Sequence, residues 1–142
     1  MADGGAEAGA GECAARGAAL ERAYVHDVYE QAGEDDAPCA PAPAVRSFLG
    51  DLEPGSLVCD VGCGNGKYLS VNPSVFAVGG DRCTRLAAQA QHDNNEVVVC
   101  DNLSLPFRDE SFDAVLSIAV VHHFATVERR AMALRELARI TR

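Results

Sequence analysis

The sequence has 142 residues, 48% of them hydrophobic, and its 21 acidic against 12 basic side chains give a net charge of −9. This length suits one domain, and the absence of an 18-residue apolar run argues against a membrane-spanning helix. The charge excludes a broad basic surface of the kind that neutralises nucleic-acid phosphates, so any nucleic-acid contact is expected to be local or supplied by another chain.

Residues 1–19 are predicted to be a disordered tail, and residues 20–142 the folded domain. The tail holds eight alanines and five glycines. These side chains bury too little apolar area to offset an ordering cost of about 1–2 kcal/mol per residue.

Two short helices and a loop are predicted before the first strand. Leu20, Tyr24 and Val28 recur at helical spacing, which predicts an apolar stripe packed against the domain. The prolines, glycine and consecutive acids of residues 31–43 predict a loop. A second helix is predicted over residues 45–52, where four apolar side chains again share one face.

Short apolar runs alternate with helical segments in the rest of the sequence. Strands are predicted over residues 56–61, 75–80, 96–100 and 112–121. Helices are predicted directly after the glycines that follow the first strand, over residues 84–91, and after Thr126, which can N-cap the final helix through Arg142. This order predicts an α/β fold with a mostly parallel sheet.

The six cysteines do not suggest a disulfide framework or a metal site. The sequence shows no secretory signal and no Cys-x-x-Cys pair, so reduced thiols are expected. Cys59 and Cys63 form the one close pair, in a segment that the glycine pattern already explains. We therefore expect no bound metal, and we expect the protein in the cytoplasm, with the nucleus as a second compartment.

Polar residues at three strand ends predict a nucleoside-binding site, because ligands of doubly wound sheets bind beyond the carboxyl ends of the strands. Glycines after the first strand permit positive φ and a close approach of the ligand to the backbone. Asp81, at the end of the second strand, can accept hydrogen bonds from both hydroxyls of a ribose. The candidate cofactor-binding residues are Asp60, Gly62, Gly64, Gly66, Asp81, Asp101 and Asn102.

Spacing and charge distinguish between nucleoside cofactors. A dinucleotide requires Gly-x-Gly-x-x-Gly so that its pyrophosphate meets a helix N-terminus, whereas this loop has Gly-x-Gly-x-Gly. Asp60 would repel a pyrophosphate, but it suits a sulfonium or an amino group. The residues favour S-adenosylmethionine, and an NAD-dependent oxidoreductase is an alternative that nicotinamide binding would support.

Several motifs point together to a known family. The first set is Asp60-Val-Gly62-Cys-Gly64-Asn-Gly66, Gly80-Asp81-Arg, Val-Cys-Asp101-Asn and Leu-Pro-Phe-Arg-Asp-Glu-Ser-Phe-Asp113. It resembles the class I S-adenosylmethionine-dependent methyltransferases. The second set is Tyr24-Val-His26-Asp-Val-Tyr29-Glu and Ser117-Ile-Ala-Val-Val-His122-His123-Phe-Ala-Thr-Val-Glu-Arg-Arg130. It resembles the eukaryotic tRNA wobble-uridine carboxymethyl methyltransferases, which include a methyltransferase domain fused to an AlkB-like oxygenase.

This resemblance implies a Rossmann-like class I methyltransferase fold with sheet order 3-2-1-4. It implies methylation of the carboxylate of 5-carboxymethyluridine at the tRNA wobble position, with a small zinc-binding activator subunit as partner. By position, Asp60 and the three glycines would line the methionine part of the cofactor, Asp81 the ribose, and Asp101 with Asn102 the adenine.

His122 and His123 are the candidate catalytic residues, because they follow the fourth strand on the side of the expected methyl group. Either could hold the substrate carboxylate or the uracil; alternatively, one is structural and the other exposed. Methyl transfer to a carboxylate requires alignment and little acid–base chemistry, since the nucleophile is ionised at neutral pH. Tyr24, His26 and Tyr29 could cover the cofactor as a lid, although Tyr24 also fits the packed stripe.

The sequence departs from the family pattern at two places. Where the family has an aromatic-Ser segment, an Arg and Trp-Pro, residues 31–43 contain three acids and neither Arg nor an aromatic residue, which predicts a weaker grip on RNA or carboxylate. The sequence also ends in the helix after the fourth strand, so the C-terminal strands of the family fold are expected to be missing. A non-catalytic module that binds cofactor or a partner is therefore the alternative function. The third strand is expected to be a sheet edge that can accept a partner strand.

Overall fold

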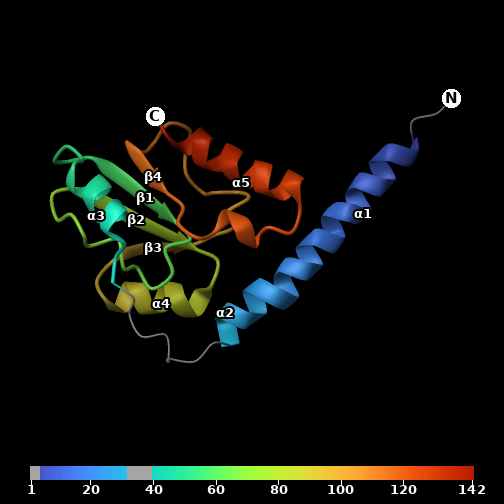
Figure 1. The fold of residues 1–142 in the computed structure, drawn as a ribbon, viewed down its shortest axis with the longest axis horizontal. Helices are drawn as coiled ribbons and strands as arrows, with labels where there is room; N and C mark the ends of the chain where they lie inside the picture. Colours follow the sequence, from blue (N-terminus) through green and yellow to red (C-terminus); the bar gives the residue numbers. More distant parts are fainter. Residues whose placement is uncertain (1–3, 32–39) are drawn as a thin grey trace.

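A four-stranded parallel sheet forms the centre of the molecule. Its strands are β1 (Leu57–Val61), β2 (Phe76–Asp81), β3 (Glu96–Val99) and β4 (Ala114–Leu116). They pair in the order β3-β2-β1-β4, as Figure 1 shows for the computed structural model, which describes residues 4–31 and 40–142. This arrangement confirms the predicted α/β class and the 3-2-1-4 order.

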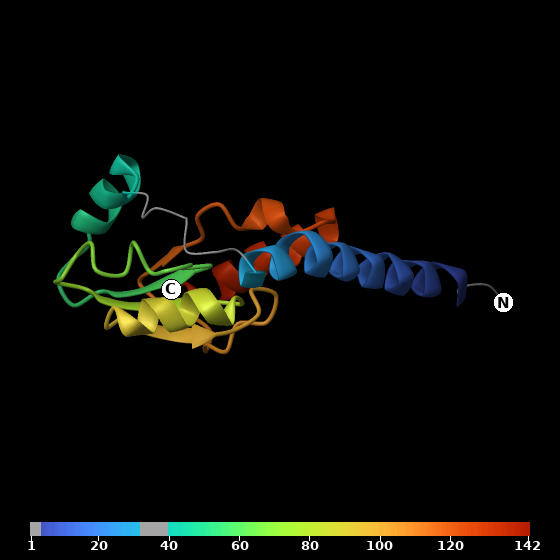
Figure 2. The same ribbon diagram turned by 90° about the horizontal axis from the view of Figure 1, so that it is seen from below.

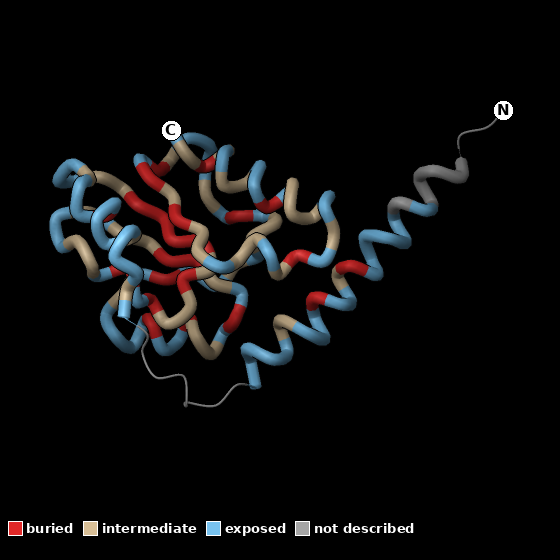
Figure 3. The backbone as a smooth tube through the Cα atoms, in the orientation of Figure 1, coloured by how far each residue is buried: buried red, intermediate tan, exposed pale blue. Residues whose placement is uncertain are grey.

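Helices cover both faces of the sheet. They include α3 (Pro43–Gly50), α4 (Thr84–His92) and α5 (Val127–Ile140). Neighbouring side chains of β1 point to opposite faces, so Val58 packs with Leu49 of α3, whereas Cys59 packs with Ile140 of α5. Small side chains of α4 pack against Val97 of β3. The strands carry most of the continuous buried backbone (Figure 3), and their buried ends position the loops that follow them.

Local chemistry sets the ends of the helices. The proline at position 43 occupies the first turn of α3, where a missing N–H costs nothing. Thr126 caps α5 as predicted, because its Oγ1 accepts a hydrogen bond from the Arg129 N–H at 3.2 Å. Arg142 does not belong to the last turn of this helix, which ends at Ile140. It forms an ion pair with Asp113 at 2.8 Å instead.

Two predictions about the strand ends are wrong. The glycines after β1 lead into turns, with hydrogen bonds from Leu69 N–H to Gly66 O and from Val71 N–H to Tyr68 O, where a helix was predicted. The fourth strand has three residues where ten were predicted. Ala119 has a φ of +57°, a left-handed conformation that is incompatible with continued pairing.

A long helical segment stands at the N-terminus. It consists of α1 (Gly4–Glu21), a π-helical turn (Arg22–His26) and α2 (Asp27–Gln31). Its N-terminal part projects away from the sheet (Figures 1 and 2). The described part of the predicted disordered tail, residues 4–19, belongs to α1 in the structure. Alanine is the strongest helix former, and the C-terminal end of α1 is anchored to α5 by Glu21.

The predicted apolar stripe of this segment does not pack against the domain. Leu20, Tyr24 and Val28 are 47%, 75% and 55% exposed. Their spacing is helical, as predicted, but the segment turns its other face to the domain, because Glu21 and Glu30 make the connecting hydrogen bonds. Most of the predicted loop at 31–43 falls on residues 32–39, which lie outside the described residues. Within the described ranges, no helix combines the length and apolarity needed to cross a membrane.

Candidate functional site

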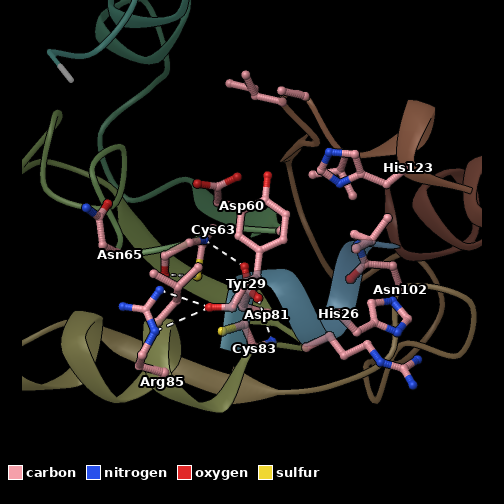
Figure 4. Close-up of a pocket in the computed structure, with 18 of the residues that line it drawn as sticks. His26, Tyr29, Asp60, Cys63, Asn65, Asp81, Cys83, Arg85, Asn102 and His123 are labelled. Atoms are coloured by element: carbon pink, nitrogen blue, oxygen red, sulfur yellow. Dashed lines mark hydrogen bonds between the residues drawn. The ribbon is translucent and has the colours of Figure 1, made fainter. Parts of the chain in front are cut away.

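A cavity of about 470 Å³ lies beyond the carboxyl ends of the strands. It receives side chains from the loops after all four strands and from the N-terminal segment (Figure 4). The predicted residues that line it are Asp60, Gly62, Gly64, Asp81, Asp101, Asn102 and His123. Gly66 and His122 are not among the lining residues. The topology thus brings together seven of the nine predicted positions at the place where α/β sheets bind ligands.

Gly62, in the loop after β1, has a backbone conformation that favours glycine. Its φ is +81°, and a Cβ there would overlap the side chain of Val120. Gly66 shares the positive φ, at +86°, and a Cβ on it would also lie 3.1 Å from the Cβ of Ala90 in α4. Gly66 therefore allows the loop to pack on α4, while Gly62 and Gly64 face the cavity.

Asp81 holds the loop in place. Its carboxylate accepts hydrogen bonds from the Gly64 N–H at 2.7 Å and the Cys83 N–H at 2.8 Å. Asp101 is engaged by the Leu103 N–H at 2.9 Å and by the Arg82 guanidinium at 3.1 Å. Both carboxylates are fixed in orientation before any ligand binds, which lowers the cost of ordering them on binding.

Three buried side-chain polar atoms have no hydrogen-bond partner in the described part of the chain: Asp60 Oδ2, Asn102 Oδ1 and His26 Nδ1. All three belong to residues that line the same cavity. A buried polar atom without a partner costs about 1–3 kcal/mol, so the cavity is built for a ligand that supplies complementary groups. Burial, and next the negative charge of Asp81, raise the pKa of Asp60 to about 7.

The two histidines after β4 occupy different environments. They belong to a short 3-10 helix, Val121–His123. His123 is half-buried and faces the cavity, where its ring lies 5.6 Å from that of Tyr29 and 4.2 Å from that of His122. Burial, and next the proximity of His122, lower the pKa of His123. His122 is exposed, so His123 is the better placed of the two to meet a substrate.

The N-terminal segment contributes a wall that sequence spacing predicted only in part. His26 and Tyr29 line the cavity, as a lid would require, whereas Tyr24 points to solvent. Glu30 accepts hydrogen bonds from the N–H and the hydroxyl of Thr84 at 2.7 and 3.1 Å, and Arg85 donates to the Tyr29 carbonyl at 3.0 Å. These partners lie 54 and 56 residues apart in sequence, so no local pattern indicates them.

The cysteines and acids of the site do not form a metal centre. In the described ranges, no group of three or more His, Cys, Asp or Glu side chains is placed to hold a metal ion. Cys59, Cys63, Cys83 and Cys100 are free thiols. Burial raises the pKa of Cys59 to about 12 and that of Cys100 to about 11, which makes these thiols poor nucleophiles.

Comparison with known proteins decides between the families that could share this geometry. The profile described as "Methyltransferase domain" matches residues 59–142. The chain belongs to this methyltransferase family. Its residues fit S-adenosylmethionine, because the buried Asp60 oxygen faces the cavity where a cationic methionine part is expected, and the Asn102 oxygen can accept from an adenine amino group.

Curated relatives of this methyltransferase act on tRNA according to their names. The chain is 52% identical over 123 residues to "Probable tRNA methyltransferase 9B" of Mus musculus. The matched region covers 85% of this chain and 28% of the relative. It is 52% identical over 125 residues to "tRNA (carboxymethyluridine(34)-5-O)-methyltransferase alkbh8" of Xenopus tropicalis, with 87% of this chain and 20% of the relative covered. The chain thus spans about a quarter of the length of these relatives.

Solved structures share the fold. Magnesium protoporphyrin IX methyltransferase from Synechocystis, solved with bound SAM, superposes with a TM-score of 0.69 at 19% identity, over 85% of this chain and 72% of that chain. A putative methyltransferase of Haloferax volcanii, solved in complex with the Trm112 methyltransferase activator, superposes with a TM-score of 0.60 at 23% identity, over 90% of this chain and 52% of that chain. At these identities the structures establish the fold alone.

Proposed function

We propose that this chain provides the cofactor-binding part of an S-adenosylmethionine-dependent tRNA methyltransferase that acts on the carboxylate of 5-carboxymethyl wobble uridine. The observation that carries this proposal is the cavity in which Asp60, Asn102 and His26 each present an unpaired buried polar atom. Relatives about half identical to this chain carry the names of tRNA methyltransferases. Their names supply the substrate class, and the cavity supplies the site.

The proposed reaction requires little acid–base chemistry from the protein. The bound cofactor would supply an electrophilic methyl group, and a substrate carboxylate is ionised at neutral pH. The side chains of this chain therefore have to position the two reactants and exclude water. Asp81 and Asp101 would orient the ribose and adenine ends, while His123 and Tyr29 border the part of the cavity that is left for the uracil.

Ligand-dependent unfolding tests the cofactor part of this proposal. We expect S-adenosylhomocysteine at about 100 times its Kd to raise the free energy of unfolding by about 2.7 kcal/mol. NADH is the control, since the Asp60 carboxylate repels a pyrophosphate, and it should leave the Tm unchanged. A Tm that does not respond to S-adenosylhomocysteine, or that rises with NADH, would contradict the proposal.

Methyl transfer to RNA tests the substrate part. The chain, alone and with an activator subunit, is incubated with labelled cofactor and an anticodon stem-loop that carries 5-carboxymethyluridine. A base-labile methyl ester on this RNA, and none on the same RNA with plain uridine, is the expected result. Cofactor binding without transfer in either setting would favour the second candidate, a non-catalytic module that binds cofactor or a partner.

The open edge of β3 is the surface that we propose for an activator subunit. β3 pairs with β2 on one side, and Val99 is 52% exposed. The Cys100 N–H donates to Asp81 O in β2, so strand alternation directs the Val99 N–H to the open edge. Val99→Pro removes this donor and should weaken binding of a partner strand. Val99→Thr keeps the donor, and equal binding by the two variants would exclude strand addition at this edge.

We also propose that the protein acts in the cytoplasm, with the nucleus as a second compartment. The free thiols of the described residues suit a reducing compartment. Imaging of a tagged full-length protein tests this proposal, and accumulation in the secretory pathway would contradict it.

A further inference from the structure

The three unpaired polar atoms of the cavity come from two kinds of element. Asp60 lies near the carboxyl end of β1 and Asn102 follows β3, so both occupy the strand-end positions at which α/β folds bind nucleosides. His26 comes from the N-terminal helical segment, outside the sheet. Its Nδ1 is nevertheless buried, without a partner, and part of the same cavity. The methyl-transfer chemistry described above gives this atom no role.

The backbone at His26 departs from a regular helix. Arg22–His26 form a π-helical turn between two α-helical stretches. Such turns are rare inside α-helices and are frequently found at functional sites. The widened turn ends on His26, the residue that also carries the unpaired nitrogen.

Two charged contacts hold this turn against the domain, one on each side of His26. On one side, the Glu21 carboxylate accepts two hydrogen bonds from Arg129, at 2.6 and 2.7 Å, and one from the Ala125 N–H at 2.9 Å. On the other side, Glu30 accepts from Thr84 at the first turn of α4. The position of His26 is therefore fixed from both directions, although neither contact provides a hydrogen-bond partner for its Nδ1.

The surroundings of His26 match one end of a purine. Burial, and next the positive charge of Arg82, lower its pKa, so the ring is neutral at physiological pH and has one donor and one acceptor nitrogen. Asp101 is among the charges close enough to act on this ring. Asn102, the next residue in the chain, lines the same cavity as His26, and Figure 4 labels both. A 6-aminopurine presents an amino donor beside a ring-nitrogen acceptor. An amide oxygen and an imidazole together can satisfy that pair.

We propose that His26 binds the adenine of the cofactor through Nδ1, beside Asn102, so that the N-terminal segment completes the nucleoside site. This inference rests on the proposed function, because it requires that S-adenosylmethionine occupies the cavity. It adds a cofactor-binding residue outside the strand ends, and it explains why an exposed helix is fastened to the domain on both sides of one histidine.

Calorimetric titration with two ligands tests this assignment in the 142-residue chain. The ligands are S-adenosylhomocysteine and S-inosylhomocysteine, in which an oxygen replaces the 6-amino group and changes the hydrogen-bonding edge. The variants are His26→Ala, His26→Asn, whose amide reproduces the position of Nδ1, and Tyr24→Ala, a control on the solvent-facing side of the same turn. Circular dichroism and Tm verify that each variant is folded.

We expect His26→Ala to weaken S-adenosylhomocysteine binding about three- to tenfold. His26→Asn and Tyr24→Ala should bind S-adenosylhomocysteine like the wild type. The loss of affinity caused by His26→Ala should be smaller for S-inosylhomocysteine than for S-adenosylhomocysteine. A folded His26→Ala variant with unchanged affinity, or an equal penalty with both ligands, would overturn the inference. If His26→Ala does not fold, weak binding by folded His26→Asn would overturn it. A wild type that binds neither ligand would instead overturn the proposed function.

Discussion

The sheet and the N-terminal helical segment border the same cavity, but different forces hold them in place. Val58, Cys59 and Val61 of β1 are at most 2% exposed and pack into apolar clusters on both faces of the sheet. The N-terminal segment leaves Leu20, Tyr24 and Val28 in solvent, and Glu21 and Glu30 make its hydrogen bonds to the domain. Apolar burial therefore builds the floor of the site, while charge-assisted hydrogen bonds fasten its wall.

The sheet and the N-terminal segment should therefore respond differently to substitutions and to pH. Apolar burial is non-directional and depends little on pH or salt, so damage to the sheet should unfold the whole domain. Charge-assisted hydrogen bonds depend on protonation and geometry, so damage to the fastening should release the segment and leave the sheet folded. Variants that act on one region test whether the two are separable.

The largest effect is expected in the core, for Ile140→Ala. This side chain is fully buried in α5 and packs against Cys59 and Val61 of β1. Its truncation should lower the free energy of unfolding by about 2–5 kcal/mol, measured by urea denaturation. Leu134→Ala, on the same helix but 54% exposed, is the control and should cost at most about 0.5 kcal/mol. Equal costs would show that burial in this cluster does not hold the sheet.

A smaller, pH-dependent effect is expected at Asp60. Burial, and next the Asp81 charge, raise its pKa to about 7 in the folded protein, against about 3.9 in an unfolded chain. Between these values the folded state holds a proton that the unfolded state has lost, so stability falls as pH rises through this window and then levels off.

Asp60→Asn should remove this dependence and raise the stability of the free protein by a few kcal/mol at pH 8, with no gain near pH 4. The same variant should bind S-adenosylhomocysteine more weakly, because the counter-charge for its amino group is gone. Urea titrations of both proteins across this range measure the effect, and parallel stability curves for the two would contradict it.

Sequence patterns predict the sheet far better than the N-terminal segment. Runs of apolar residues placed β1 within one residue and β3 within one residue of their observed bounds, because a buried strand needs such a run. The prediction that the stripe containing Tyr24 packs against the domain is wrong, because helical spacing does not say which face of the helix meets the domain. The decisive contact, between Glu21 and Arg129, joins residues 108 positions apart, and neither residue carries a local signal of the other.

The candidate site shows the same division. Asp60 and Asp81 lie at the carboxyl ends of β1 and β2, and Asn102 follows β3, so topology alone brings them to one edge of the sheet. Tyr29 lines the cavity from a segment that Glu30 and Arg85 connect to α4, a tertiary arrangement that composition and periodicity do not encode. The short β4 escaped prediction for a local reason, because the left-handed conformation of Ala119 is unusual for a residue with a side chain.

The fastening of the N-terminal segment is tested by Glu21→Gln. Although burial by itself raises the pKa of Glu21, hydrogen bonds from Arg129 and from the Ala125 N–H lower it on balance. Its contribution to stability is therefore present above its unfolded pKa and is lost as pH falls through the lower folded value. Hydrogen bonds to a charged group contribute about 1.5–3 kcal/mol, and glutamine keeps the shape but not the charge.

In hydrogen exchange, Glu21→Gln should increase the exchange of residues 17–31 and leave the amides of β1 protected. Glu12→Gln, at an exposed position of α1, is the matched control and should behave like the wild type. Faster exchange throughout the sheet would mean that the two regions unfold together, which would contradict their separation.

The smallest effect is expected at Thr126, where the two regions meet. Its Oγ1 caps α5, and its methyl group faces Gly17 of α1, where an added Cβ would lie 3.1 Å away. Thr126→Ala removes both contacts and should cost about 1 kcal/mol, whereas Thr126→Ser keeps the cap and should stay near the wild type in urea denaturation. If serine proves as costly as alanine, the methyl contact with Gly17 stabilises the junction. Apolar packing would then help to fasten the segment, and the contrast between the two regions would be one of degree.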